Sequence, residues 1–306
     1  MRVTQSMVSR MGMEQLANQR SRLARTQEQA STGLRLNRPS DDPVDFRSAL
    51  RLKDSVSQTG RYLRSIDLSR TRLHTTEGAI ADAAEVVDNA HTLAVQAGNS
   101  TNGPTARAAL RVQVEQYFDQ LLDASNARAP GGGYVFSGVA SDTPAFVQTG
   151  TFVSGSPPPT VAFAGDDSAV SVEIDEGVSI EVTRSGQGAF KGPVDIFAVL
   201  GQLWQGLDQN DSPAARAIIN TAMGDLNTAF DHLNVERSHV GGAEAKADSF
   251  ETRLRGQQEE LTKQVSVLEN ADAYQVYSDL AAQEAALKAS LSVAARMQQP
   301  TLLDFL

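Results

Sequence analysis

An apolar side chain recurs at every seventh position along much of this chain. A first series takes these steps with one polar member, Thr59: Leu52, Thr59, Ile66, Leu73, Ile80, Val87 and Ala94. A second series runs without interruption: Ile219, Leu226, Leu233, Val240, Ala247, Leu254, Leu261 and Leu268. A repeat this long keeps one face of an α-helix against a partner helix. The two series therefore predict two long helices, and Gly241-Gly242 leaves the second in phase, so we expect that helix to continue through them.

The pattern changes between the two series. Apolar residues alternate with polar ones at 160–164, 170–174 and 180–183, which is typical of strands. Before them, a shorter helix is expected between the breaks at 99–104 and 129–133, and a helical pattern resumes from Val194. The expected apolar face of the shorter helix, between the two breaks, is Leu110, Val114, Tyr117 and Leu121.

These patterns together predict a mainly α fold with a small inserted β domain. We expect a long antiparallel helical rod at 41–131 and 190–269, and a pair of terminal helical arms at 1–40 and 270–306. The β insertion at 132–189 is expected to face outward from the rod, because its strands are short and polar at alternate positions.

Composition narrows the class of protein. The formal net charge of −10 argues against a general nucleic-acid binder, which needs a basic face. No apolar run is long enough to span a bilayer, and the first ten residues lack the apolar core of a cleavable signal peptide. The chain has 0 cysteines, which excludes disulfides, thiol nucleophiles and zinc–thiolate sites.

The two ends of the chain carry opposite charge and thin apolar stripes. Residues 1–38 have a surplus of basic side chains and residues 269–306 a surplus of acidic ones, which favours pairing of the ends. Helices with so little apolar surface are marginal alone, so we expect the arms to fold on assembly and to pack between subunits. For the seven-residue series we expect packing within the chain instead. The predicted arm interface is Met7, Leu16, Leu23, Val276, Leu280, Leu287 and Leu291.

A break separates each arm from the rod. On one side lies N-R-P-S-D-D-P-V (37–44); on the other the apolar repeat changes phase after Leu268, at the acidic E-N-A-D (269–272). If the halves run antiparallel, the two breaks lie at the same height. The predicted arm–rod joint is Pro39, Asp41, Asp42, Pro43 and Asp272.

The aspartates at 41, 42 and 45 allow two interpretations. They could coordinate calcium or magnesium, but they lack the alternating spacing and the glycine of a calcium loop. Aspartate before a helix is usually a cap, and proline suits the first helical turn, so we favour a capped joint and predict no metal site.

Other candidate sites are weak. His232 and His239 are two turns apart, which is not a ligand spacing. The run G-G-G-Y-V-F-S-G (131–138) lacks the lysine of a phosphate-binding loop, and no nucleophile motif occurs. We therefore predict no catalytic residue, no cofactor and no enzyme activity.

The assembled segments resemble the flagellin family. A-S-T-G-L-R-L-N (30–37) with R-P-S-D-D-P (38–43) is similar to its N-terminal motif, and T-T-E-G-A-I (75–80), L-A-V-Q-A-G-N-S-T-N (93–102) and L-E-N-A-D-A-Y (268–274) are similarly placed. Three features resemble the branch that joins hook to filament rather than the filament protein. They are the prolines of R-P-S-D-D-P-V, the Y-V-F-S-G at 134–138 and the terminal T-L-L-D-F-L (301–306).

The resemblance implies a structural adaptor in an extracellular flagellum. Its implied partners are further copies of the chain in a ring, a hook-side junction protein, flagellin, and a cytoplasmic type III export chaperone on the C-terminal arm, with neither nucleic acid nor membrane. It also implies export without a cleaved signal peptide. One alternative is a short flagellin that polymerises into the filament itself. A more distant one is a type III translocator or adhesin acting through the β insertion.

Overall fold

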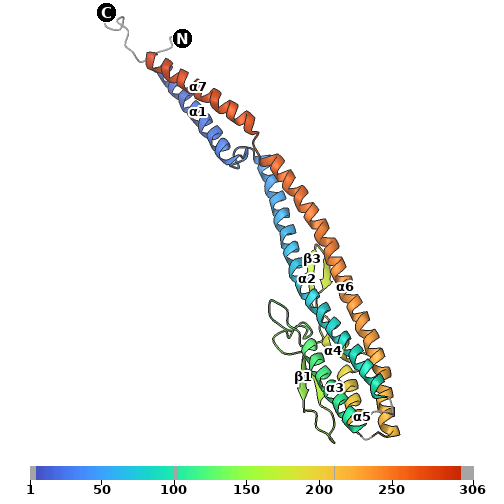
Figure 1. Ribbon diagram of the computed structural model, residues 1–306. Coiled ribbons are helices and arrows are strands. Elements are labelled where there is room, and N and C mark those ends of the chain that lie inside the picture. Colours follow the sequence, from blue (N-terminus) through green and yellow to red (C-terminus); the bar gives the residue numbers. More distant parts are fainter. Residues whose placement is uncertain (1–4, 99–102, 210, 298–306) are drawn as a thin grey trace, which may run out of the picture. The chain divides into compact units, whose positions relative to one another are not determined.

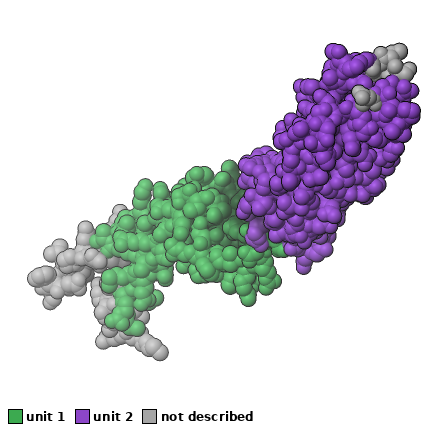
Figure 2. Space-filling model, turned by 90° about the horizontal axis from the view of Figure 1, so that it is seen from below, with its two compact units in different colours: residues 1–59, 256–306 green, residues 60–255 purple. Residues whose placement is uncertain are grey.

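The computed structural model describes residues 5–98, 103–209 and 211–297. Its helices are α1 (Gln5–Thr32), α2 (Pro43–Ala97), α3 (Pro104–Ser125), α4 (Gly186–Lys191), α5 (Ile196–Asp208), α6 (Pro213–Glu269) and α7 (Ala273–Met297) (Figure 1). Its strands are β1 (Phe146–Thr149), β2 (Thr160–Phe163), β3 (Ser171–Asp175) and β4 (Val178–Glu181). By its contacts the chain divides into unit 1, residues 1–59 and 256–306, and unit 2, residues 60–255 (Figure 2).

The two predicted long helices are confirmed as α2 and α6, of 55 and 57 residues. Helix α6 continues through Gly241 and Gly242 as expected. Proline opens both helices, since its fixed backbone angle suits the first helical turn and its missing N–H would be unpaired there anyway. The mainly α fold with a short β segment is likewise confirmed.

Within unit 2, α2 and α6 run antiparallel. Arg70 of α2 pairs with Asp248 and Glu251 of α6, whereas Glu77, two turns further along α2, pairs with Arg237, an earlier residue of α6. The seven-residue series forms the contact: from Ile66 to Ala94 and from Ile219 to Leu254 every member is almost fully buried. Thr59, the polar member of the first series, is also buried, and its hydroxyl donates a hydrogen bond to the Ser55 carbonyl at 3.0 Å.

The β segment consists of two separate antiparallel hairpins. Strand β1 pairs with β2, and β3 pairs with β4 with an irregularity between Glu173 and Asp175. The three predicted strands are present as β2, β3 and β4. The sequence patterns did not predict β1, because F-V-Q-T does not alternate apolar and polar residues, or the short helix α4, because six residues are too few to establish a helical period.

One hydrophobic core serves both the helices and the hairpins of unit 2. Phe118 of α3 and Phe197 of α5 stack edge-on, 5.6 Å between ring centroids, and Phe146 of β1 lies against Phe197 at 5.4 Å. In α3 the buried aromatic residue is Phe118 rather than the expected Tyr117, which is half-buried. The division into arms, rod and inserted domain, with the bounds given above, stays a prediction.

Unit 1 has little core of its own. Helices α1 and α7 lie side by side (Figure 1), and the Thr26 hydroxyl donates to Oε1 of Gln283 across the pair at 3.0 Å. The apolar side chains buried among the described residues of unit 1 are Leu36, Ala49 and Val276. Packing therefore contributes far less to unit 1 than to unit 2.

Candidate functional site

A network of hydrogen bonds surrounds the arm–rod joint in unit 1, and it begins where α1 ends. Gly33 takes a left-handed conformation, φ 71°, and its N–H closes the last turn on the Gln29 carbonyl at 2.9 Å. Glycine adopts this conformation without a steric penalty, which is why it ends so many helices. The chain then runs antiparallel to the segment between α6 and α7, with Leu34 opposite Asn270.

Backbone hydrogen bonds tie the two breaks together. The Arg35 N–H donates to the Glu269 carbonyl at 2.6 Å, and the Ala271 N–H donates to the Gly33 carbonyl at 2.9 Å. The two discontinuities of the sequence therefore lie side by side in space.

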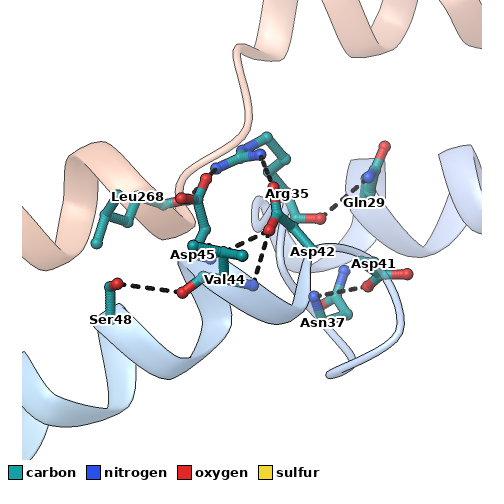
Figure 3. A network of polar contacts seen from close by, with 9 residues as sticks. All are labelled: Gln29, Arg35, Asn37, Asp41, Asp42, Val44, Asp45, Ser48 and Leu268. Atoms are coloured by element: carbon teal, nitrogen blue, oxygen red, sulfur yellow. Dashed lines mark hydrogen bonds and ion pairs between the residues drawn. The ribbon is translucent and has the colours of Figure 1, made fainter.

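Asp42 caps α2, as its position before Pro43 predicted. Its Oδ1 accepts from the N–H groups of Val44 and Asp45 at 3.0 and 3.1 Å (Figure 3). These two backbone N–H groups, with a smaller contribution from the Arg35 charge, hold the pKa of the Asp42 carboxyl below its ordinary value. The carboxylate also lies at the positive end of the helix dipole.

Arg35 is the residue at the centre of the joint, and the sequence patterns did not single it out. Its Nη2 donates to Oδ2 of Asp45 at 2.6 Å and to the Leu268 carbonyl at 2.9 Å (Figure 3). Its Nη1 lies 4.0 Å from Oδ2 of Asp42. One guanidinium thus joins the first turn of α2 to the last turn of α6, an arrangement that uses its rigid fork of donors.

A second ion pair missed by the sequence patterns lies beside it. Nζ of Lys53 is 2.6 Å from Oε2 of Glu269, and the glutamate side chain is only 10% exposed. A carboxylate so nearly buried needs a paired cation. Among the joint residues that the sequence patterns missed, Gly33 is the one that a local pattern could have found. Glycine often stands directly after the last residue of a helix, as Gly33 does after α1.

The remaining predicted joint residues have separate roles. Asp41 accepts from the N–H of Asn37 at 3.1 Å (Figure 3) and from the N–H of Arg38 at 2.8 Å, which holds the loop before α2. Asp272 caps α7 through the N–H of Tyr274 at 2.9 Å. Pro39 is exposed, and no hydrogen bond of the described network involves it.

The predicted arm residues fall into two groups. Val276 is buried and Leu16, Leu23, Leu280 and Leu287 are half-buried, whereas Met7 and Leu291 are 58% and 41% exposed. Tyr274 and Tyr277 are also exposed, at 86% and 60%. Paired α1 and α7 therefore leave apolar surface uncovered within unit 1. The predicted terminal T-L-L-D-F-L at 301–306 lies outside the described residues.

The described residues contain no group of three or more histidine or acidic side chains placed to hold a metal ion. Each aspartate of the 41–45 cluster is engaged by protein groups: Asp41 and Asp42 by backbone N–H, and Asp45 by Arg35. His232 hydrogen-bonds to the Gly188 carbonyl at 2.7 Å. Among the described helices, none combines the length and apolar character needed to cross a membrane.

Long heptad helices, a tied joint and terminal helices with uncovered apolar faces define a helical assembly protein. The chain belongs to the bacterial flagellin family: residues 3–141 match the model of the flagellin N-terminal helical region and residues 223–306 that of the C-terminal helical region.

Similar proteins include flagellar hook-associated protein 3 of Salmonella typhimurium and of Escherichia coli. They are 24% and 23% identical to this chain, over 99% of it and 99% of each relative. Among solved structures, a putative flagellar hook-associated protein from Vibrio parahaemolyticus has a TM-score of 0.66 at 18% identity, covering 75% of this chain and 99% of that one. The Legionella pneumophila hook-associated protein-3 has a TM-score of 0.62 at 14% identity, over 71% and 98%. These structures share the fold.

Proposed function

We propose that this chain is a structural adaptor of the bacterial flagellum that forms a junction ring between a hook-side junction protein and the flagellin filament. The observation that carries the proposal is the extent of similarity. Hook-associated protein 3 relatives match from end to end, whereas the Borreliella burgdorferi filament core protein matches 32% of this chain and 30% of its own length. A Salmonella phase 1 flagellin matches 76% of this chain but 48% of itself.

The joint supports a role in assembly. It ties the end of α1, the start of α2 and the end of α6 through Arg35, Asp45 and the Leu268 carbonyl. These hydrogen bonds hold the ends of three helices together at the base of the terminal helices. The uncovered stripes on α1 and α7 are the surfaces that neighbouring subunits would cover, with Met7 and Leu291 at their exposed ends.

The partners follow from this placement. Copies of the chain border one another in the ring, the hook-side junction protein lies on one side, and flagellin lies on the other. We further propose a cytoplasmic chaperone that covers the C-terminal arm before export through the flagellar type III apparatus, without a cleaved signal peptide, to the outside of the cell. A structural role of this kind requires no enzyme activity.

Electron microscopy of a strain that lacks the chain tests the proposal. We expect hooks without filaments, flagellin shed to the medium, and recovery of filaments when the full chain is supplied. Purified chain seeded with flagellar fragments separates the alternative, because a filament protein should extend the fragments and a junction protein should not. Long filaments of the chain itself would contradict the adaptor role.

A further inference from the structure

A groove of about 630 Å³ runs between α2 and α3 in unit 2. Its α2 wall follows one helical stripe, from Thr75 through Ala79, Asp82 and Val86 to Asn89. The fifteen residues from Thr75 to Asn89 make this wall about 21 Å long, which is roughly four turns of helix. Gly78 adds to its depth, since a Cβ at this position would meet no atom within 4 Å.

The groove has an apolar floor and a charged rim. Small or apolar residues lie along the bottom, among them Val86 and Ala124, while Asp82 and Glu85 on α2 face Asp123 on α3. No basic residue lines the groove, and none of the three carboxylates forms an ion pair with the described residues. This combination suits a partner helix with an apolar side chain flanked by cations.

Charge points to another copy of this chain as the partner. Residues 60–255 hold 24 acidic and 14 basic side chains and so carry the whole net charge of −10. The first turns of α2 have the opposite character. There Leu50 is 47% exposed between the exposed Arg47 and Arg51, and neither arginine forms an ion pair with the described residues.

We propose that this groove receives the first turns of α2 from a neighbouring copy. Arg47 and Arg51 are one helical turn apart, as are Asp82 and Glu85, so the two pairs match in spacing. Leu50 and the aliphatic stems of the arginines would cover the apolar floor. The contact is head-to-tail, a groove on one copy and a ridge on the next, and such contacts form a ring when the rotation from copy to copy closes. The inference rests on the ring proposed above.

Disulfide trapping in isolated flagella tests the contact directly, because the native chain has no cysteine. Gly78→Cys combined with Leu50→Cys should give a linked two-chain product on mild oxidation. The control replaces Gly78→Cys with Gly224→Cys, since Gly224 is also a helical glycine with open space around it. A product only in the first pair supports the inference. No product, or an equal amount in the control, overturns it.

Charge exchange gives a second test in cells. Asp82→Lys with Glu85→Lys, or Arg47→Glu with Arg51→Glu, should each reduce filaments per cell by about tenfold at unchanged secretion. All four changes together should restore most of them. The control is Asp67→Lys with Asp231→Lys, two exposed carboxylates outside the groove, which should have no effect.

Two results overturn the contact: normal filaments in the first double variant, or no recovery in the fourfold variant. Filaments in the strain lacking the chain would instead contradict the proposed function. Failure of the trapping in a strain whose filaments depend on the chain contradicts the groove contact alone.

Discussion

Nη2 of Arg35 lies 2.6 Å from Oδ2 of Asp45, and the same nitrogen donates to the Leu268 carbonyl at 2.9 Å. A single side chain of the loop after α1 therefore contacts the first turn of one long helix and the last turn of the other. Both groups are partly exposed, so the ion pair itself contributes little, and the value of Arg35 lies in joining three segments.

Replacing Arg35 should loosen the joint. For Arg35→Ala we expect a loss of about 1 kcal/mol of local stability, because two charge-assisted hydrogen bonds are lost from a partly exposed site. Hydrogen exchange of the amides at 35–48 and 268–272 should then be several-fold faster. The matched control is Arg38→Ala, whose exposed pair with Glu28 lies 3.0 Å apart. Equal effects at both positions would contradict a central role for Arg35.

The cap at Asp42 should make the start of α2 sensitive to acid. The N–H groups of Asp45 and Val44 hold its folded-state pKa below the ordinary value of 3.8, so its stabilising effect is fully present above that value. It is lost as the pH falls through the lower, folded-state pKa. Amide chemical shifts of Val44 and Asp45 should titrate with a midpoint below pH 3.8. Asp42→Asn retains a capping oxygen but has no carboxyl, so it should abolish that titration. If the same titration persists in the variant, another group causes it.

Alanine should stabilise α6 at its paired glycines. A Cβ at Gly241 or Gly242 would meet no atom within 4 Å, and glycine in a helix interior costs about 0.5–1 kcal/mol relative to alanine. Each of Gly241→Ala and Gly242→Ala should therefore raise the unfolding free energy of unit 2 by up to about 1 kcal/mol in urea titrations. Gly206→Ala is the control with the opposite sign, because its Cβ would lie 2.8 Å from Cγ1 of Ile219. Destabilisation at 241 and 242 would show that the helix requires glycine at these positions.

Charge on the α7 stripe should separate assembly from folding. Leu280 and Leu287 are half-buried side chains of unit 1. We therefore expect that the double variant Leu280→Asp, Leu287→Asp leaves the unfolding of unit 2 unchanged but forms no filaments. Leu226→Asp with Leu233→Asp places charge at fully buried positions, and an unpaired buried charge costs several kcal/mol. That variant should not fold at all. Circular dichroism and filament counts measure the two outcomes; if both pairs unfold the protein alike, the stripe is core rather than interface.

Local sequence determined the two long helices, the start of α2 and three of the strands. The seven-residue series from Leu52 and from Ile219 predicted α2 and α6 because a periodic apolar face is a property of consecutive residues. Asp42 and Pro43 predicted the start of α2 for the same reason, since a cap acts on the backbone two or three residues away. Strands β2, β3 and β4 were predicted by alternation within five residues.

Tertiary structure alone decided which distant groups meet. Lys53 and Glu269 are 216 positions apart in the sequence, and no local pattern pairs them. Nothing in the local sequence distinguishes Arg35 from the other arginines, and its role follows from its contact with the end of α6. The hairpins, expected to face solvent, supply fully buried side chains such as Phe146 and Ile174 to the core of unit 2. The apolar repeat and the helix caps depend on residues that are close in the sequence. The ion pairs and the core depend on contacts that form only when the chain folds back on itself.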